Sequence, residues 1–197
     1  MNGRQWGRTW GIGLAGAALS GCAAHGSEPP AARTAAAAES RASQLAADLA
    51  AADTAFEAQD RPALVAALTR ITRRSARPLD PRAPDPVPLW RAAVPGDVPP
   101  LRGRALGPGY VRGTLAPGAA TQLEQLFLSG QAATVAANSR PRDDLRLRLY
   151  DAAGKLVCER APASARDCRF TPVFTQRYRI ELNNAGAAAA RYYLVVD

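Results

Sequence analysis

The stretch Leu145-Arg-Leu-Arg-Leu-Tyr150 alternates strictly between apolar and polar side chains. Such alternation is typical of an antiparallel strand that has one face in the core and the other in solvent. Asp151-Ala-Ala-Gly154 follows at once, and its glycine suits the left-handed position of a hairpin turn. This segment therefore predicts a β-hairpin at the surface of a sheet.

Short strands and turns surround this hairpin from about residue 101 to residue 197. Pro117-Gly118 and Asn183-Asn-Ala-Gly186 are typical turn sequences between them. Seven or eight short strands at this spacing predict a mainly β protein with an antiparallel β-sandwich over residues 101–197. The other predicted strands cover residues 110–115, 122–129, 132–138, 155–159, 166–170, 178–182 and 191–196.

The same region resembles a known family. Residues 144–157 (DLRLRLYDAAGKLV) match the pattern D-L-x-L-x-L-Y-D-x-x-G-x-L-V, and residues 170–195 are similar to F-x-P … Y-x-I-x-V-x-N-x-G … Y-x-L. These are motifs of bacterial pre-peptidase C-terminal domains, and the resemblance covers about residues 105–197. The resemblance implies a jelly-roll-like, non-catalytic sandwich of the kind appended to exported proteases and other exported enzymes. Some domains of this family bind calcium or extracellular polymers. Asp143, Asp144 and Asp151 match no family calcium site clearly and suit strand ends and turns.

Residues 32–77 predict an α-helical hairpin. Apolar residues recur at spacings of three and four up to Phe56, and Asp60 is placed to cap a second helix with Pro62 in its first turn. Few of these apolar side chains are large, so the hairpin must pack against the sandwich, a partner or another copy.

Residues 78–100 are dense in proline and predict a semi-rigid linker with polyproline character. Trp90 is its one large apolar residue and is expected to dock on a domain. Few contacts should cross such a linker, which predicts that the sandwich folds without the helices.

Four arginines, Arg70, Arg73, Arg74 and Arg77, crowd the end of the second predicted helix. One interpretation is that they stabilise the helix end, where cations favour the helix dipole. The other is a patch for anionic headgroups or lipopolysaccharide phosphate. Both interpretations stay open from the sequence.

Residues 1–21 predict a signal peptide. Arg4 and Arg8 supply the positive charge, and residues 10–19 form an apolar segment too short to span a bilayer. Leu19-Ser-Gly21-Cys22 follows and resembles the lipobox of bacterial lipoproteins. The resemblance implies that the Cys22 thiol is acylated and that a signal peptidase cuts between Gly21 and Cys22. An ordinary secretory signal with an incidental cysteine is the alternative.

Two or more acyl chains anchor a protein stably, so the predicted location is the cell envelope. Ala23 follows the lipid-bearing position, which resembles the pattern for sorting to the outer membrane, facing the periplasm, if the host has two membranes. Residues 22–31 predict a flexible tether, and His25, the only histidine, lies in it. Cleavage removes two basic residues and lowers the net charge from +8 to +6.

Cys158 and Cys168 form an even pair in an exported chain, where disulfides persist. We expect them to flank a hairpin and to be joined by a disulfide that contributes about 2–3 kcal/mol of stability. A metal site is the alternative, but two cysteines are too few ligands.

These features exclude most function classes. One histidine, an envelope signal and no phosphate-binding or nucleic-acid motif argue against a triad hydrolase, a zinc protein and a nucleic-acid partner. The sequence predicts no cofactor, and it indicates a non-catalytic module for a protein partner or envelope polymer. The alternatives are an accessory or inhibitor module for a separately encoded exported protease or hydrolase, and a carboxylate hydrolase. The oligomeric state is not indicated.

The first prediction concerns processing. Cys22→Ser should leave an uncleaved or unlipidated precursor, because acylation needs the thiol. Electrophoretic mobility and membrane flotation measure this, with Ser20→Ala as a control that keeps the lipobox pattern. A Cys22→Ser protein that is cleaved normally and floats with membranes would contradict the lipobox.

Overall fold

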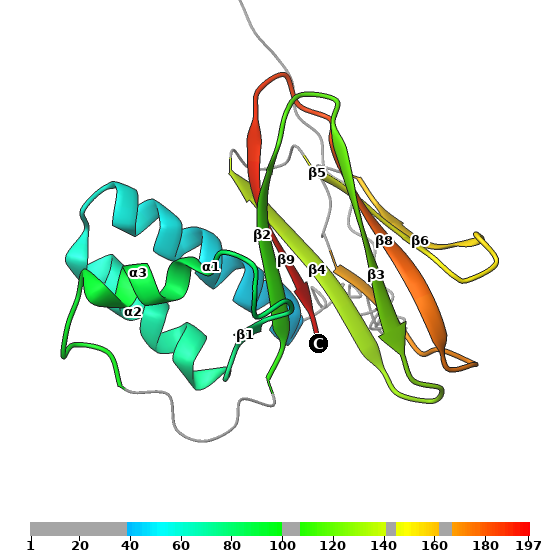
Figure 1. The fold of residues 1–197 in the computed structure, drawn as a ribbon, viewed down its shortest axis with the longest axis horizontal. Coiled ribbons are helices and arrows are strands. Elements are labelled where there is room, and N and C mark those ends of the chain that lie inside the picture. The colour runs from blue at the N-terminus through cyan, green and yellow to red at the C-terminus, as the bar shows by residue number, and fades with distance from the viewer. Residues whose placement is uncertain (1–38, 100–106, 141–144, 162–166) are drawn as a thin grey trace, which may run out of the picture. The chain divides into compact units, whose positions relative to one another are not determined.

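The computed structural model describes residues 39–99, 107–140, 145–161 and 167–197. Helices come first and strands follow, as Figure 1 shows. The helices are α1 (Arg41–Glu57), α2 (Arg61–Arg73) and α3 (Pro86–Ala92), and a two-residue strand, β1 (Arg77–Pro78), lies between α2 and α3. The remaining strands are β2 (Gly109–Leu115), β3 (Ala120–Phe127), β4 (Ala133–Arg140), β5 (Leu145–Tyr150), β6 (Leu156–Arg160), β7 (Asp167–Phe170), β8 (Gln176–Asn184) and β9 (Ala190–Val196).

The strands form two sheets that face each other. One has the order β1-β2-β9-β4-β7 and the other the order β3-β8-β5-β6. Leaving β1 aside, each sheet has four strands. The chain crosses from one sheet to the other after every strand except at the β5–β6 hairpin, and the first long strand, β2, pairs with the last, β9. This is the jelly-roll order. The predicted fold class, a mainly β jelly-roll-like sandwich preceded by a helical hairpin, is confirmed.

The predicted hairpin at β5 and β6 is present. Asp151 accepts hydrogen bonds from the backbone N–H groups of Ala153 and Lys155, and Gly154 adopts φ +78°. Leu145, Leu147 and Leu149 are fully buried between the sheets, while the intervening arginines lie on the outer face. The alternation in the sequence therefore corresponds to a sheet whose outer face is polar.

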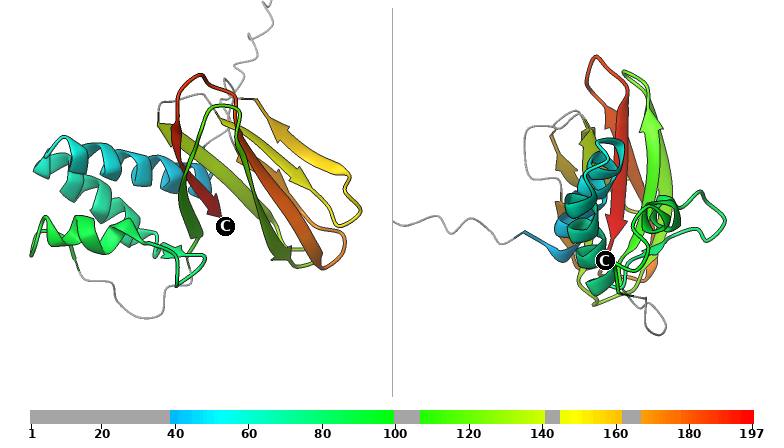
Figure 2. Two further views of the ribbon diagram at one scale, coloured as in Figure 1. Left: turned by 45° about the horizontal axis from the view of Figure 1, so that its top comes forward. Right: turned by 90° about the vertical axis from the view of Figure 1, so that its left-hand side faces the viewer.

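Strand β9 is buried on both sides. Tyr192, Leu194 and Val196 belong to the core between the sheets, whereas Tyr193 and Val195 point the other way, toward the helices. A strand that is covered on both faces needs a continuous apolar run, which the sequence Tyr-Tyr-Leu-Val-Val supplies. The sheet that contains β9 is thus the middle layer of the molecule (Figure 2).

The first two helices begin with side-chain caps, of which the sequence predicted the one at Asp60, and the predicted start of the first helix near residue 32 lies outside the described residues. Ser40 caps α1, and the carboxylate of Asp60 accepts a hydrogen bond from the N–H of Ala63 at the start of α2. Helix α1 packs on β4 and β9 through alanines and leucines, of which Ala42, Leu45 and Leu49 are fully buried. The short alanine side chains let the helix lie close to its neighbours.

The proline-rich segment differs from the prediction. Residues 86–92 are the helix α3 rather than polyproline, because both prolines lie in its first turn, where a missing N–H costs nothing. Asp85 caps this helix and also accepts a hydrogen bond of 2.6 Å from the Tyr110 hydroxyl. Trp90 docks as expected. Its side chain is buried, with its ring 6.3 Å from that of Tyr193.

The expectation of few contacts across residues 78–100 is also wrong. One apolar cluster joins all three helices to Tyr110, Ala136, Tyr193 and Val195 on the outer face of the sheet. The boundary proposed at residue 101 therefore cuts through a shared core. Independent folding of the sandwich stays a prediction, and a sandwich without the helices would have to fold with this apolar face exposed to water.

Truncation tests the boundary. We expect a fragment of residues 101–197 to unfold at least about 10 °C below residues 39–197, because it exposes Tyr193 and Val195. A fragment that begins at Pro86 keeps Trp90 and should lie between them. Thermal unfolding by circular dichroism under oxidising conditions measures this. Equal midpoints for all three fragments would mean that the helices add nothing to the sandwich.

Candidate functional site

A cluster of charges joins α1 to the sheet. The side chain of Asp53 is only 3% exposed and pairs with an arginine from each of three neighbouring strands. The distances from the arginine nitrogens to the Asp53 oxygens are 3.6 Å for Arg112 of β2, 3.1 Å for Arg140 of β4 and 2.5 Å for Arg191 of β9. We call these four residues and Glu57 the Asp53 cluster.

Glu57 lies one turn after Asp53 and shares two of its partners. It pairs with Arg140 at 3.0 Å and accepts a short hydrogen bond from Arg191. The hydrogen bond from Arg191, assisted by Arg140, holds the pKa of Glu57 below its usual value of 4.5. Glu57 is therefore ionised at neutral pH and is not a general acid. This pair of carboxylates holds the helix against the sheet and does not suit the paired-carboxylate chemistry considered above.

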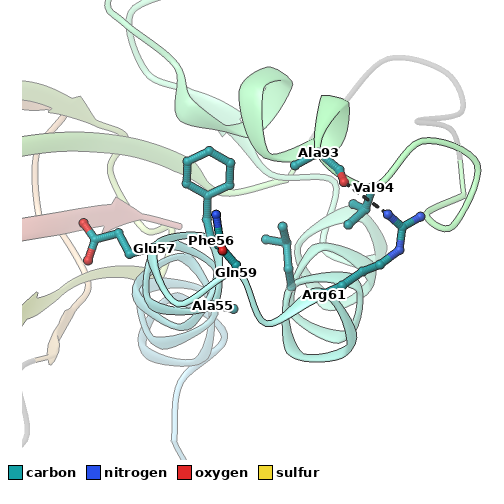
Figure 3. A pocket seen from close by; sticks show the side chains of 8 residues that line it. Ala55, Phe56, Glu57, Gln59, Arg61, Ala93 and Val94 are labelled. Carbon is teal, nitrogen blue, oxygen red and sulfur yellow. Dashed lines mark hydrogen bonds between the residues drawn. The ribbon is translucent and has the colours of Figure 1, made fainter.

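A pocket opens next to this cluster, between the end of α1, the start of α2 and the end of α3 (Figure 3). Its volume is about 540 Å³. Phe56, Leu64 and Val94 give it an apolar wall, and Glu57, Gln59 and Arg61 supply the polar groups. Arg61 spans one side, since it donates a hydrogen bond to the Ala93 carbonyl and forms a 2.6 Å ion pair with Asp97. Such a pocket suits an apolar side chain with a polar neighbour. Ala55 and Ala93 complete its lining.

The predicted arginine cluster divides into two pairs. Arg70 and Arg74 both bind the carboxylate of Asp48 on α1, at 2.5 and 2.8 Å. They hold the two helices together. Arg73 and Arg77 are exposed, and neither forms an ion pair with another residue in the described part of the chain. The anionic-surface interpretation stays a prediction, now confined to these two side chains.

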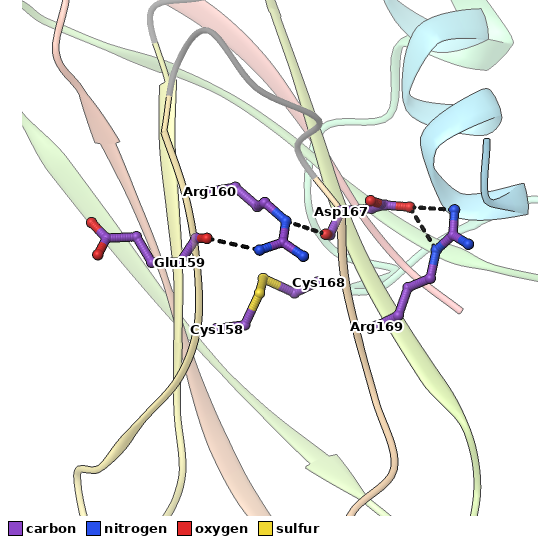
Figure 4. The surroundings of a disulfide bond; sticks show 6 residues. All are labelled: Cys158, Glu159, Arg160, Asp167, Cys168 and Arg169. Carbon is purple, nitrogen blue, oxygen red and sulfur yellow. Dashed lines mark hydrogen bonds and ion pairs between the residues drawn. A yellow bond between two sulfur atoms is a disulfide. The ribbon is translucent and has the colours of Figure 1, made fainter. Parts of the chain in front are cut away.

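The predicted disulfide is confirmed, but its surroundings are not those expected. Cys158 and Cys168 are bonded, with their Cα atoms 5.9 Å apart (Figure 4). The prediction that they flank a hairpin is wrong, because β6 and β7 belong to different sheets and are the edge strand of each. The disulfide therefore joins the two sheets at one open side of the sandwich. Arg160 reinforces this link by donating a hydrogen bond to the Asp167 carbonyl.

Several predicted residues lie outside the described ones. Cys22, Gly21 and His25 are among them, as are Asp143 and Asp144. Within the described ranges, no three His, Cys, Asp or Glu side chains come together as a metal site would require. None of the helices described is long and apolar enough to cross a membrane.

Sequence reasoning missed the Asp53 cluster and the pocket. One signal was available for the cluster: Asp53 and Glu57 are spaced four apart on a helix whose other buried positions are mostly alanine. Two acids on one face of a helix share partners. The arginines could not be assigned to these acids, since they lie 59 to 138 positions after Asp53 in the chain.

Comparison with known proteins places the sandwich among several solved structures. No protein family matches the chain, and no curated protein does. The similar structures include PliG of Aeromonas hydrophila, a periplasmic inhibitor of g-type lysozyme (10% identity, TM-score 0.40, 46% of this chain and 84% of that one). The pre-peptidase C-terminal domain of a Bacillus anthracis collagenase has 12% identity and a TM-score of 0.40, over 45% of this chain and 87% of that domain. The mitogen of Yersinia pseudotuberculosis has the same identity and TM-score, over 46% and 84%. Similarity at this level carries no functional assignment.

The Asp53 cluster generates a stability prediction. Asp53→Ala should lower the free energy of unfolding by about 2–3 kcal/mol, because it leaves three partly buried arginines without their shared carboxylate. Urea unfolding measures the effect. Glu124→Ala is the matched control, since that exposed carboxylate forms no ion pair with another described residue and should cost under about 0.5 kcal/mol. Equal losses for the two variants would contradict the proposed role of Asp53.

Proposed function

We propose that this protein is a lipid-anchored bacterial envelope lipoprotein whose helices and sandwich form a non-catalytic binding module for a protein partner. The observation that carries the proposal is the short apolar segment that ends in Leu19-Ser-Gly21-Cys22. A chain with that signal is held at a membrane, where it meets other exported proteins at high effective concentration.

The pocket between the three helices supports a protein rather than a polysaccharide partner. Its wall is aliphatic and aromatic, and its polar groups lie where they can orient one chain of a peptide. A carbohydrate polymer would need many hydrogen-bonding groups along an extended surface. The Asp53 cluster fixes α1 to the sheet, and the ion pairs of Asp48 hold α2 against α1, so the pocket is preformed.

Site-specific crosslinking in the native host tests this proposal. A photoreactive phenylalanine analogue at Gln59, in the full lipidated chain, should capture one main partner. The same analogue at Glu124, on the polar face of the other sheet, is the control. Ala93→Phe, which fills the pocket, should abolish the Gln59 product. Identical products from both positions, or a product that survives Ala93→Phe, would overturn the proposal.

The identity of the partner separates two versions of this function. Capture of an exported protease or lysozyme-like hydrolase, with a change in its activity, would make the chain an accessory or inhibitor module. Capture of a non-enzymatic envelope protein would make it an assembly module.

A further inference from the structure

Most of the exposed large apolar side chains that the structure describes lie at one end of the sandwich. Among the described residues, six of the seven exposed large apolar side chains belong to three connections between strands or to the strand ends beside them. Leu126 and Leu128 lie at the β3–β4 turn, Val173 and Phe174 in the β7–β8 loop, and Leu156 and Val157 just after the β5–β6 turn. Figures 1 and 2 show these three connections at the same end.

Two of these connections form one structure, which we call the apolar tip (Leu126, Leu128, Val173 and Phe174). Val173 is 74% and Phe174 is 70% exposed, values that a soluble surface seldom gives to two adjacent large apolar side chains. The tip projects from the sandwich as loops, and its shape differs from the concave pocket between the helices.

The backbone of the tip is bonded internally. Ser129 donates its hydroxyl to the Val173 carbonyl at 2.6 Å and its N–H to Thr175 Oγ1 at 3.0 Å. The N–H of Gly130 donates to the Pro172 carbonyl at 2.8 Å. These bonds fix the two loops together and satisfy polar groups that would otherwise oppose transfer into an apolar medium.

Below the tip, the sandwich is rigid and carries positive charge. The rings of Phe127, Phe170 and Tyr178 pack together with their centroids 5.0 to 5.6 Å apart, and Phe127 makes an edge-to-face contact with each of the other two. Arg177 is exposed on β8 directly opposite Leu126, and Arg179 stacks on the ring of Tyr150. Apolar side chains at a protruding end with arginines behind them are typical of a surface that enters the headgroup region of a membrane.

The start of the described chain lies beside β7, the strand that leads into the tip. Burial alone would raise the pKa of Asp167, but hydrogen bonds from Ser40, Arg169 and Ser43 hold it below 3.8, which places the start of α1 beside β7. From Asp167, β7 runs directly into the loop that holds Val173 and Phe174. From Cys22 to Glu39 the chain takes 17 steps and can span at most about 60 Å. This reach is several times the length of β7, so a lipid on Cys22 and the tip can contact the same bilayer.

We propose that the apolar tip inserts into the headgroup region of a phospholipid membrane as a second, non-covalent contact. The inference rests on the proposed lipid anchor for its biological setting, since the anchor keeps the tip within reach of the bilayer. Insertion there would orient the sandwich and leave the pocket between the helices directed away from the tip and toward a partner.

Vesicle binding by the unlipidated chain tests the inference separately from the anchor. The full mature chain with Cys22→Ser is mixed with vesicles of phosphatidylethanolamine and phosphatidylglycerol and sedimented. We expect it to bind, and we expect Val173→Ser with Phe174→Ser to weaken binding about tenfold or more. Leu89→Ser is the matched control, because Leu89 is 60% exposed on α3, and it should bind as the parent does.

A second measurement locates the contact. Phe174→Trp should shift its emission to shorter wavelength with vesicles and be quenched by lipids brominated near the headgroups, while the buried Trp90 should not respond. Three outcomes would each overturn the proposal. The parent chain does not bind vesicles, the tip variant and the Leu89 variant bind equally, or replacing Val173 and Phe174 changes the oligomeric state without lipid. Failed vesicle binding with normal acylation of Cys22 would leave the proposed anchor intact.

Discussion

The buried carboxylate of Asp53 is the interaction on which the arrangement of helices and sheet depends. It receives arginines from β2, β9 and β4, three strands that come together only when the first and last long strands of the chain have paired. The helix can therefore dock with its charge satisfied only on a completed sheet. Around this point the alanines of α1 and the rings of Trp90 and Tyr193 exclude water, which strengthens the ion pairs. The pocket between the helices has a fixed shape as a result.

Local structure was predictable from the sequence wherever a short-range rule applies. The alternation in β5, the turn at Gly154 and the cap at Asp60 each depend on residues within one turn or one strand, and all three are present. The prediction failed where pairing is non-local. The spacing of Cys158 and Cys168 suits a hairpin as well as it suits two edge strands in opposite sheets, and only the strand order separates these cases. In the proline-rich segment, composition indicated polyproline, although Pro86 and Pro88 occupy the one turn of α3 that tolerates proline.

The candidate sites were less predictable than the fold. The run Tyr-Tyr-Leu-Val-Val in β9 carried the information that its sheet is covered on both faces, since β5 in the other sheet alternates and β9 does not. Nothing local indicates which element covers the second face. The four arginines at the end of α2 were visible as a cluster, but Asp48, which binds two of them, lies on another helix. Val173 and Phe174 follow Pro172 in a segment where apolar residues could equally have been core.

The disulfide has a consequence for the two edge strands that it joins. The edge strands β6 and β7 lie at the same open side of the sandwich, and each presents backbone groups that a further strand could pair with. Joining them through Cys158 and Cys168 prevents either edge from separating from the body and exchanging with a second molecule. The covalent link therefore protects the fold against strand exchange and fibril growth through these two edges.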